Sequence, residues 1–551
     1  MSLFSVLNVA TTGLTASQLG MDVAGQNITN ADVDGYSRKR LNTSASYRSD
    51  GTYGQMGMGV DVINIQRMRS GFIDDEIRDQ TQQVGYYTQI DQTYQNLQSI
   101  FTEPSNTGLQ EYMDQFFDSW QNLANNPADT SARTMVKTDG EILTNTFHNL
   151  ASQLSNARQA MNDQITQDAD KVNQLTKDIY NLNSEIASVQ STGQNANDSL
   201  DKRDKDMTQL AKLIDFTSQE NSLGQVTIST GGSLIVSPAY QQDIETTTST
   251  YKAADGSTIT NVGLRFKDSK IDYMPQSGEI RAFIDSRDQV MPEYQTKLDT
   301  LANALVAKVN AIHETGYDLN GVSGNDFFDP TSTGASDIKL SPSIESNVQN
   351  IAAAAGGQTL VAPAQNLVLT YGQQPEANLG HANVLQNSVI VTTAGGATLT
   401  EGTDYQVDYQ TGDIQLLGAG YNGTPLTVTY SYTAGSSQGT GDNTNAVAIA
   451  QLREQMTMDN DALGNSTSTY SENYASMIGR LGEEDNEAKS NLDSRTSLVT
   501  QYQNQQDAIS GVSLDEEMAN LVQLQHTYEA SARVVTTAGT MLDSLIAMVI
   551  T

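Results

Sequence analysis

A seven-residue repeat of apolar side chains in the last stretch of the chain, Ser513–Thr551, constrains its fold more than any other feature of the sequence. A strict seven-residue step gives a helix a narrow apolar stripe, which is the seam of a coiled coil and fits one partner helix. We expect that partner to come from another part of the chain or from another molecule. The repeat consists of Leu514, Leu521, Tyr528, Val535, Leu542 and Val549.

The opening residues carry a matching seam. Leu7, Leu14, Met21 and Ile28 keep the same seven-residue step, on a helix expected from about Leu3 to Ile28. The alternative is an ordinary amphipathic helix that covers its own domain. Two seams at opposite ends of 551 residues predict that the termini pair with each other, or with the termini of neighbouring copies. Since isolated helices are only marginally stable in water, we expect both ends of the chain to be disordered in the free monomer and to become ordered on assembly.

Charge and cysteine content exclude several classes of function. The formal charge is −35, from 65 acidic and 30 basic side chains. This charge argues against a protein that binds nucleic acid or an anionic membrane surface. The absence of cysteine excludes disulfides, thiolate nucleophiles and cysteine-ligated metals. The opening segment lacks the basic region of a cleaved signal peptide and is too polar to insert in a membrane. If the protein is extracellular, we expect export by a route that keeps the first helix.

The internal patterns predict an elongated multidomain protein that is mainly α with β insertions. An apolar pattern over about 131–190 predicts one helix roughly 90 Å long, within a long helical bundle. Short Gly-punctuated apolar runs predict a small β domain and a β-sandwich-like insert. The expected domains are a terminal coiled-coil assembly domain at 1–36 with 513–551, an elongated helical-bundle domain at 37–215 with 286–351 and 440–512, a small β domain at 216–285, and a variable β-sandwich-like insert at 352–439.

The sequence gives no support for a catalytic, metal or cofactor site. Residues 418–423 match a dinucleotide-binding fingerprint, but a strand follows where phosphate binding needs a helix, so a hairpin turn is expected. Residues 30–35 imitate the opening of a calcium loop, but Leu41 occupies the position that needs a bidentate Glu. The histidines lack a second histidine at helical spacing, which leaves little material for a zinc site or for a Ser/His pair. They are His148, His313, His381 and His526.

Several segments resemble one family. Asn27 and Asn30, followed by Gly35, Tyr36, Ser37 and Arg38, resemble the signature that closes the first helix of bacterial flagellar rod, hook and hook-associated proteins. The family usually has Thr-Pro before Gly-Tyr, whereas this chain has Val33-Asp34. Further similarity to the hook-associated protein 1 family covers both ends and most of the helical middle. Its segments are 57–62 followed by Ile65, Arg67, Phe72 and Arg78, then 277–283 ahead of 287–288, 310–313 leading into 316–321, 514–521 and 528–533.

The resemblance implies a structural role in the bacterial flagellum. It implies a protein that self-associates through its terminal helices into a ring or tube at the junction between hook and filament. Its partners would be the hook protein and the second junction protein, and it would meet the flagellar export apparatus and an export chaperone before it becomes extracellular. It implies no enzymatic activity and no cofactor.

Other functions remain open at this point. The filament protein and the neighbouring junction protein are close relatives, but the signature over 27–38 and the long middle argue against both. A surface adhesin would use the Thr- and Tyr-rich insert to bind a host or matrix ligand. An enzyme acting on cell-wall glycan ranks last, because nothing in the spacing of the acidic residues favours a catalytic pair over solvated helix faces.

Overall fold

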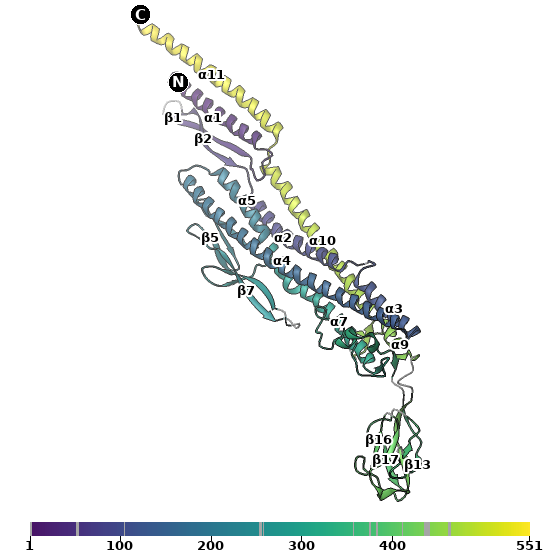
Figure 1. Cartoon of the computed structure of the whole chain (residues 1–551). Coiled ribbons are helices and arrows are strands. Elements are labelled where there is room, and N and C mark those ends of the chain that lie inside the picture. Colours follow the sequence, from purple (N-terminus) through teal and green to yellow (C-terminus); the bar gives the residue numbers. More distant parts are fainter. Residues whose placement is uncertain are drawn as a thin grey trace.

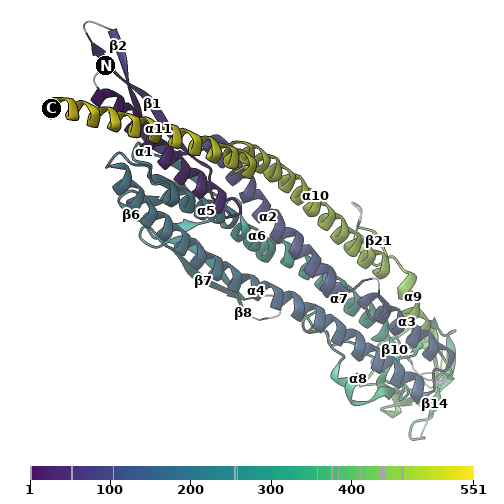
Figure 2. The same ribbon diagram turned by 90° about the horizontal axis from the view of Figure 1, so that it is seen from above.

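The computed structural model of the chain is long and narrow, and its two termini lie together at one end (Figure 1). A β-rich insert lies at the other end, and long helices run between the two (Figure 2). The predicted fold class, mainly α with paired terminal helices and small antiparallel sheets, is confirmed. The structure describes residues 3–550 except 51–53, 104, 253–255, 257, 356–357, 374–375, 382–383, 410, 435–440 and 461–463.

The end that carries both termini is named here the terminal unit. It consists of α1 (Leu3–Thr29), α11 (Leu514–Ile550) and a hairpin of β1 (Lys39–Asp50) and β2 (Gly54–Arg67). The two helices lie antiparallel, since Gly13 is beside Ser531 and Gly20 is beside Leu524. The predicted pairing of the termini therefore occurs within one molecule.

The hairpin of the terminal unit is much longer than the sequence indicated. In the sequence, the alternation of Val60 and Val62 after a glycine turn indicates a short strand. In the structure, β1 and β2 pair from Lys39 opposite Arg67 to Asp50 opposite Gly54. The hairpin lies along α1, where the Val60 N–H donates to Thr12 Oγ1 at 3.3 Å. Strand β1 is polar and lacks the apolar alternation that marks a half-buried strand, which explains why it was missed.

Most of the remaining helices form an elongated body. The predicted rod is confirmed as α4, and the Asp129 side chain caps it by accepting from the Ser131 N–H. The largest core of the body surrounds Trp120, which is fully buried between the rings of Phe116 and Phe327. The helices of the body are α2 (Gly71–Phe101), α3 (Leu109–Asn125), α4 (Thr130–Gln190), α5 (Asn197–Leu213), α6 (Glu279–Asp285), the π-helix η1 (Ser286–Val290), α7 (Met291–His313), α8 (Pro342–Ser346), the 3-10 helices η2 (Val348–Asn350) and η4 (Leu452–Glu454), α9 (Thr444–Gln451) and α10 (Tyr470–Ser510).

Two small sheets cover the second half of α4. Their order is β3-β4-β5-β6 and β7-β8-β9. Three asparagines of α4, Asn162, Asn173 and Asn183, hold strand backbones by mimicking a neighbouring strand. The amide of Asn183, for example, donates to Val226 O at 2.8 Å and accepts from Val226 N at 2.9 Å. The strands are β3 (Thr217–Glu220), β4 (Val226–Thr230), β5 (Ser233–Ser237), β6 (Tyr240–Gln241), β7 (Ile244–Lys252), β8 (Thr258–Phe266) and β9 (Asp272–Tyr273).

The insert has its own core, which contains Leu369, Val391, Ile414, Leu426 and Val428. Two three-stranded sheets, β13-β18-β15 and β14-β17-β16, enclose this core, and β12 pairs with β19 in a separate two-stranded ribbon. Its elements are β12 (Gln358–Val361), β13 (Gln365–Val368), β14 (Ala377–Asn378), β15 (Ile390–Thr393), β16 (Tyr405–Asp408), β17 (Asp413–Leu416), the 3-10 helix η3 (Ala419–Tyr421), β18 (Pro425–Thr429) and β19 (Ser431–Ala434). Two further hairpins, β10 (Gly316–Tyr317) with β11 (Ala354–Ala355) and β20 (Met458–Asn460) with β21 (Ser466–Ser468), belong to the body.

Candidate assembly interface

Small residues of α1 make its closest approach to α11. A methyl group on Gly20 would lie 2.9 Å from Leu524 Cδ2, and one on Gly13 would lie 3.3 Å from Ser531 Oγ. The buried residues of α1 follow the same face and are mostly small, namely Ala10, Ser17, Gly20, Val23, Ala24 and Asn27. On α11 the facing positions include Glu517 and Ala538, both buried. The helices therefore pack closely through a face that a search for large apolar residues does not find.

The predicted seam residues lie beside these close contacts. On α1, Leu7, Leu14, Met21 and Ile28 are half-buried along one flank of the contact face. On α11, Leu521, Tyr528, Val535 and Leu542 are half-buried and alternate with Glu517, Leu524, Ser531 and Ala538 in steps of three and four. Leu514 is 49% exposed, and the side chain of Val549 lies outside the described residues. The seven-residue pattern of α11 therefore lies on the α1-facing side, and its α1 counterpart lies beside the positions that approach α11 most closely.

Other apolar side chains of the terminal unit point into solvent. Phe4 on α1 is 70% exposed, and α11 carries a series of exposed apolar residues, which lie either on faces that do not meet α1 or, like Leu545, beyond the described start of α1. Exposed apolar groups of this extent are typical of an interaction surface. We call the α11 series the outer apolar face, and it consists of Met518, Val522, Val534, Met541, Leu545 and Ile546.

The family-signature residues build the connection behind α1. The buried Asn27 amide donates to Lys39 O and accepts from Lys39 N, both at 2.9 Å, which fixes the start of β1 to the end of α1. The Tyr36 hydroxyl donates to Asn27 Oδ1 at 2.8 Å. Burial, with the charges of Asp201, Asp198 and Glu517, raises the pKa of Tyr36 to about 12, so this donor keeps its proton at neutral pH.

The other signature residues extend the connection to α5 and α11. The hydroxyl of Ser37 donates to Asp201 Oδ1 at 2.7 Å, and Arg38 Nε donates to the buried Glu517 at 2.7 Å. Gly35 has φ +85°, a backbone conformation that glycine adopts without strain. Asn30 stays local, since its amide donates to the Gln26 carbonyl at 2.9 Å. The signature therefore couples α1, the hairpin, α5 and α11 at one point.

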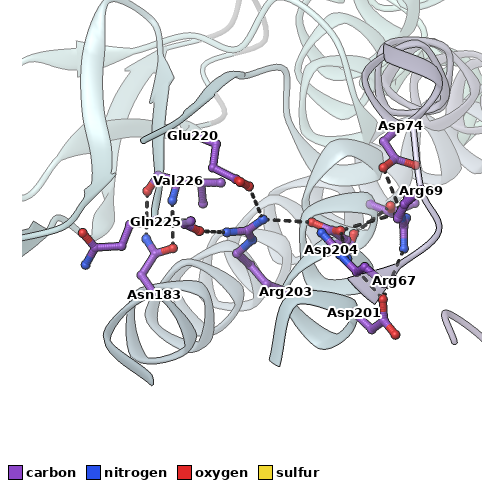
Figure 3. A network of polar contacts seen from close by, with 12 residues as sticks. Arg67, Arg69, Asp74, Asn183, Asp201, Arg203, Asp204, Glu220, Gln225 and Val226 are labelled. Carbon is purple, nitrogen blue, oxygen red and sulfur yellow. Dashed lines mark hydrogen bonds and ion pairs between the residues drawn. The ribbon is translucent and has the colours of Figure 1, made fainter. Parts of the chain in front are cut away.

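A buried ionic network next to this point fastens the hairpin to the body (Figure 3). Arg67, the last residue of β2, lies 2.6 Å from Asp204 and 3.1 Å from Asp201 of α5, while Arg69 pairs with Asp74 of α2 at 2.8 Å. Arg203 continues the network to Glu220 at 2.7 Å. We call these residues the junction network, which no sequence pattern indicates.

The charge balance of the junction network favours the ionised form of Asp204. Burial alone would raise the pKa of Asp204, but the guanidinium groups of Arg67, Arg203 and Arg69 hold that pKa below its usual value. Arg67 lies more than 130 residues before Asp201 and Asp204 in the chain, so no local motif indicates this part of the network. Polar cavities of about 500 Å³ and 520 Å³ border the network, so the terminal unit meets the body through a polar joint.

The described residues offer no cluster of three or more His, Asp or Glu side chains that could hold a metal ion. His313 is fully buried, and its ring lies between the carbonyl of Asn325 and the N–H of Ala352. Burial lowers the pKa of His313 to about 4, so it is a neutral core residue. In the part of the chain that the structure describes, every helix is too short or too polar to cross a membrane.

Comparisons with known proteins agree with this geometry. Residues 94–328 match the family model of the flagellar hook-associated protein FlgK helical domain, and residues 503–548 match that of the flagellar basal body rod FlgEFG protein C-terminal region. A model for a protein of unknown function matches residues 322–446, which include the insert.

Full-length relatives carry the same assignment. Flagellar hook-associated protein 1 of Bacillus subtilis is 26% identical and covers 99% of this chain and 98% of its own length. The protein of that name from Escherichia coli is 28% identical over 98% of this chain and 99% of its own length. The solved flagellar hook junction protein FlgK from Burkholderia pseudomallei shares the fold, with a TM-score of 0.57 at 18% identity, and covers 80% of this chain and 100% of its own.

The signature residues, the two paired terminal helices and the long helical body thus occur together in one chain that aligns with these relatives from end to end. The chain belongs to the flagellar hook-associated protein 1 family, a family of non-enzymatic structural components of the bacterial flagellum.

Proposed function

We propose that copies of this chain pack side by side through their terminal units and form a ring or tube that joins the flagellar hook to the filament. The outer apolar face is the observation that carries this proposal, because α1 covers only one side of α11. A second copy is the occupant that we assign to it. Leu545 and Ile546 are 53% and 49% exposed and gain burial when a neighbouring copy packs against them.

The length of α11 supports the same assignment. Extending the Gly13–Ser531 and Gly20–Leu524 register places Leu3 opposite about residue 541, because both helices advance equally per residue. The last turns of α11 therefore extend beyond the described start of α1. They lie where a helix of a neighbouring copy can continue the bundle.

Charge favours contact through the terminal units. Copies that each carry a formal charge of −35 repel one another, so close packing requires surfaces with few charges. Residues 1–31 contain Asp22 as their one charged side chain, and residues 518–551 contain Glu529, Arg533 and Asp543. The termini can therefore be buried between copies without bringing many acidic groups together.

We further propose the partners that the family implies. The ring would contact the hook protein on one side and the second junction protein on the other, after passage through the flagellar export apparatus with an export chaperone. Export without cleavage of a signal peptide agrees with the position of α1, because removing α1 would uncover Leu524 and Ser531 on α11.

Charge substitution on the outer apolar face tests the assembly. Met541→Glu and Leu545→Glu, each expressed in a strain that lacks this gene, should yield exported protein with a normal thermal transition but no incorporation into flagella. Electron microscopy should then show hooks without attached filaments. Asn145→Glu, at an exposed position of α4, is the control and should leave filaments attached. Filaments attached in both α11 variants would refute assembly through this face.

The insert favours a second function, adhesion to a host or matrix ligand, because it has a core of its own and lies far from the terminal unit. Deletion of residues 358–434 separates the two functions. A junction protein should keep filaments and motility without the insert. Loss of surface attachment in cells that still swim would assign adhesion to the insert, and unchanged attachment would exclude it.

A further inference from the structure

The C-terminal half of α10 is covered on one side only. Between Ala488 and Ser510 none of its residues is buried, and the hydrophobic clusters of the body include no residue from this stretch. It contacts α2 through polar groups, including Arg495 Nη1, which donates to Gln80 Oε1 at 3.2 Å, and Gln506, which donates to Asp74. A half-helix that buries so few side chains can gain stability from a further packing partner.

The exposed side of this half-helix has an uncharged section between two exposed aspartates, Asp493 and Asp507. No acidic or basic side chain occurs between Arg495 and Asp507, in a chain that has 65 acidic and 30 basic residues. Ser497, Gln501, Asn504 and Ala508 follow one another in steps of four and three, the spacing of a seam for one partner helix. We call this surface the uncharged stripe, and it consists of Ser497, Thr500, Gln501, Asn504, Gln505 and Ala508, all of them exposed.

We infer that the uncharged stripe is a second contact surface between copies of this chain, in the body and outside the terminal unit. This inference rests on the proposed function. Because each copy has a formal charge of −35, two bodies can approach closely only where at least one of them presents a surface without acidic groups. The amide groups of the stripe can donate to carboxylates or amides of a neighbour. The hydroxyls of Ser497 and Thr500 donate within their own helix and can accept from amides of a neighbour.

Continuity with α11 supports a second copy as the occupant. Helix α10 ends at Ser510 and α11 begins at Leu514, so the stripe comes shortly before the outer apolar face along the chain, with the exposed Asp507, Asp515 and Glu516 between the two. When the terminal units of two copies pack together, the stripe of one copy is held near the body of the next. The contact then forms at a high effective concentration, so even a modest polar surface can contribute to assembly.

Paired substitutions test the stripe in the full-length protein. Ser497→Glu with Asn504→Glu puts two charges one heptad apart on the stripe, and Asn145→Glu with Ser152→Glu puts the same charges at the same spacing on exposed positions of α4. The readout is the amount of protein incorporated into isolated flagella, after circular dichroism has shown that both purified variants unfold as the wild type does. We expect incorporation to fall about a hundredfold for the stripe pair, since burying unpaired charges weakens an interface strongly, and to stay unchanged for the α4 pair.

A third variant separates contact from repulsion. Ser497→Lys with Asn504→Lys should also block incorporation if the stripe is buried between copies, because either sign of charge would be buried. Normal incorporation of the Glu pair, or loss with the Glu pair but not with the Lys pair, would overturn the inference. The Leu545→Glu variant distinguishes the two proposals: a failure of Leu545→Glu together with normal incorporation of the stripe variants refutes the stripe alone.

Discussion

The body and the terminal unit differ in what they bury. The body fully buries large side chains, including Trp120, Phe116, Phe147 and Leu298. Among the described residues of the terminal unit, the buried apolar side chains are Ala10, Val23, Ala24 and Ala538. The hydrophobic clusters of the described chain contain no residue of α1, β1, β2 or α11. The body therefore contains its own driving force for folding, and the terminal unit has little of its own.

This difference indicates how a rigid subunit can still assemble specifically. Folding of the body is complete in one molecule, because its apolar groups are already out of water. The terminal unit holds small groups inside and large apolar groups outside, so its remaining stabilisation becomes available only between molecules. We therefore expect the ends of the free monomer to be digested by protease before the body is, and to become protected on assembly.

The largest difference is expected when one large side chain is truncated in each region. Trp120→Ala should destabilise the body by about 3–5 kcal/mol, because it leaves a cavity in a close-packed core. The indole Nε1 of Trp120 has no hydrogen-bond partner in the part of the chain described, so the loss is one of packing. Leu524 of α11 is only half-buried. Leu524→Ala should therefore lower the free energy of unfolding of the monomer by about 1 kcal/mol or less.

Thermal unfolding followed by circular dichroism measures both variants. The comparison fails if Leu524→Ala lowers the melting temperature of the monomer as much as Trp120→Ala does. That result would mean that the terminal unit folds as one cooperative unit with the body.

Local sequence patterns predicted the two regions unequally. The rod α4 and the repeat of α11 were predictable because apolar residues recur along them for many turns. The hairpin was missed because Lys39 is the one residue of β1 that is buried in the described structure, so β1 leaves no apolar pattern. The contact face of α1 was missed because close helix packing there uses Gly13, Ser17 and Gly20 in place of large residues.

The second effect concerns the junction network, which joins the two regions. Arg67→Ala removes the closest cation of Asp204 and should cost about 3 kcal/mol, because it leaves buried carboxylates incompletely paired. It should also loosen the terminal unit from the body. The matched control is Lys205→Ala, which breaks the exposed pair with Asp34 and should cost less than about 1 kcal/mol.

Spin labels can report this loosening directly, since the chain contains no cysteine of its own. Labels on cysteines introduced at the exposed Gln525 of α11 and Ser152 of α4 should give a broader distance distribution in Arg67→Ala than in the wild type or in Lys205→Ala. An unchanged distribution in Arg67→Ala would show that the junction network does not fix the terminal unit.

The third prediction concerns a hydrogen-bonded pair that occurs in both regions, in which an asparagine side chain binds the backbone N–H and C=O of one strand residue. We call this arrangement an asparagine clasp. Asn27 holds Lys39 in the terminal unit, and Asn183 holds Val226 in the body, each through two bonds of 2.8–2.9 Å. Replacement of either asparagine by alanine should cost about 2 kcal/mol locally, because a buried N–H and a buried C=O lose their partners. Asn183→Ala should lower the global melting temperature, whereas Asn27→Ala should mainly speed amide exchange in the hairpin.

Asn181→Ala, at an exposed position two residues from Asn183, controls for the change in helix propensity and should be nearly neutral. Equal losses of global stability in Asn27→Ala and Asn183→Ala would erase the difference between the regions. The clasps also illustrate the limit of sequence reasoning, because an asparagine on a helix looks the same in sequence whether it faces solvent or a strand.

The smallest effect lies in the body, at the point where its two main cores meet on α4. Asp168 is buried there, between Ile165 and Ala169 of the second core, and one of its oxygens has no hydrogen-bond partner in the described structure. Burial raises the pKa of Asp168 from 3.8 to about 6, although the amide of Gln164 partly offsets this by donating to the other oxygen at 3.1 Å. At neutral pH the body therefore carries a buried charge that weakens it.

The sign of the pH dependence follows from this raised pKa. The folded protein binds the Asp168 proton more tightly than the unfolded chain does, so the stabilising contribution is fully present below about pH 4 and is lost as the pH rises through about 6. Asp168→Asn, which stays neutral, should match the wild type near pH 4 and exceed its free energy of unfolding by about 1–2 kcal/mol above pH 6.5, allowing for solvent screening. Asp170→Asn, at an exposed position on the same helix, should show no such pH-dependent gain. Urea unfolding of the three proteins across pH 4–7 measures the difference, and a constant gap between Asp168→Asn and the wild type over that range would mean that Asp168 does not titrate there.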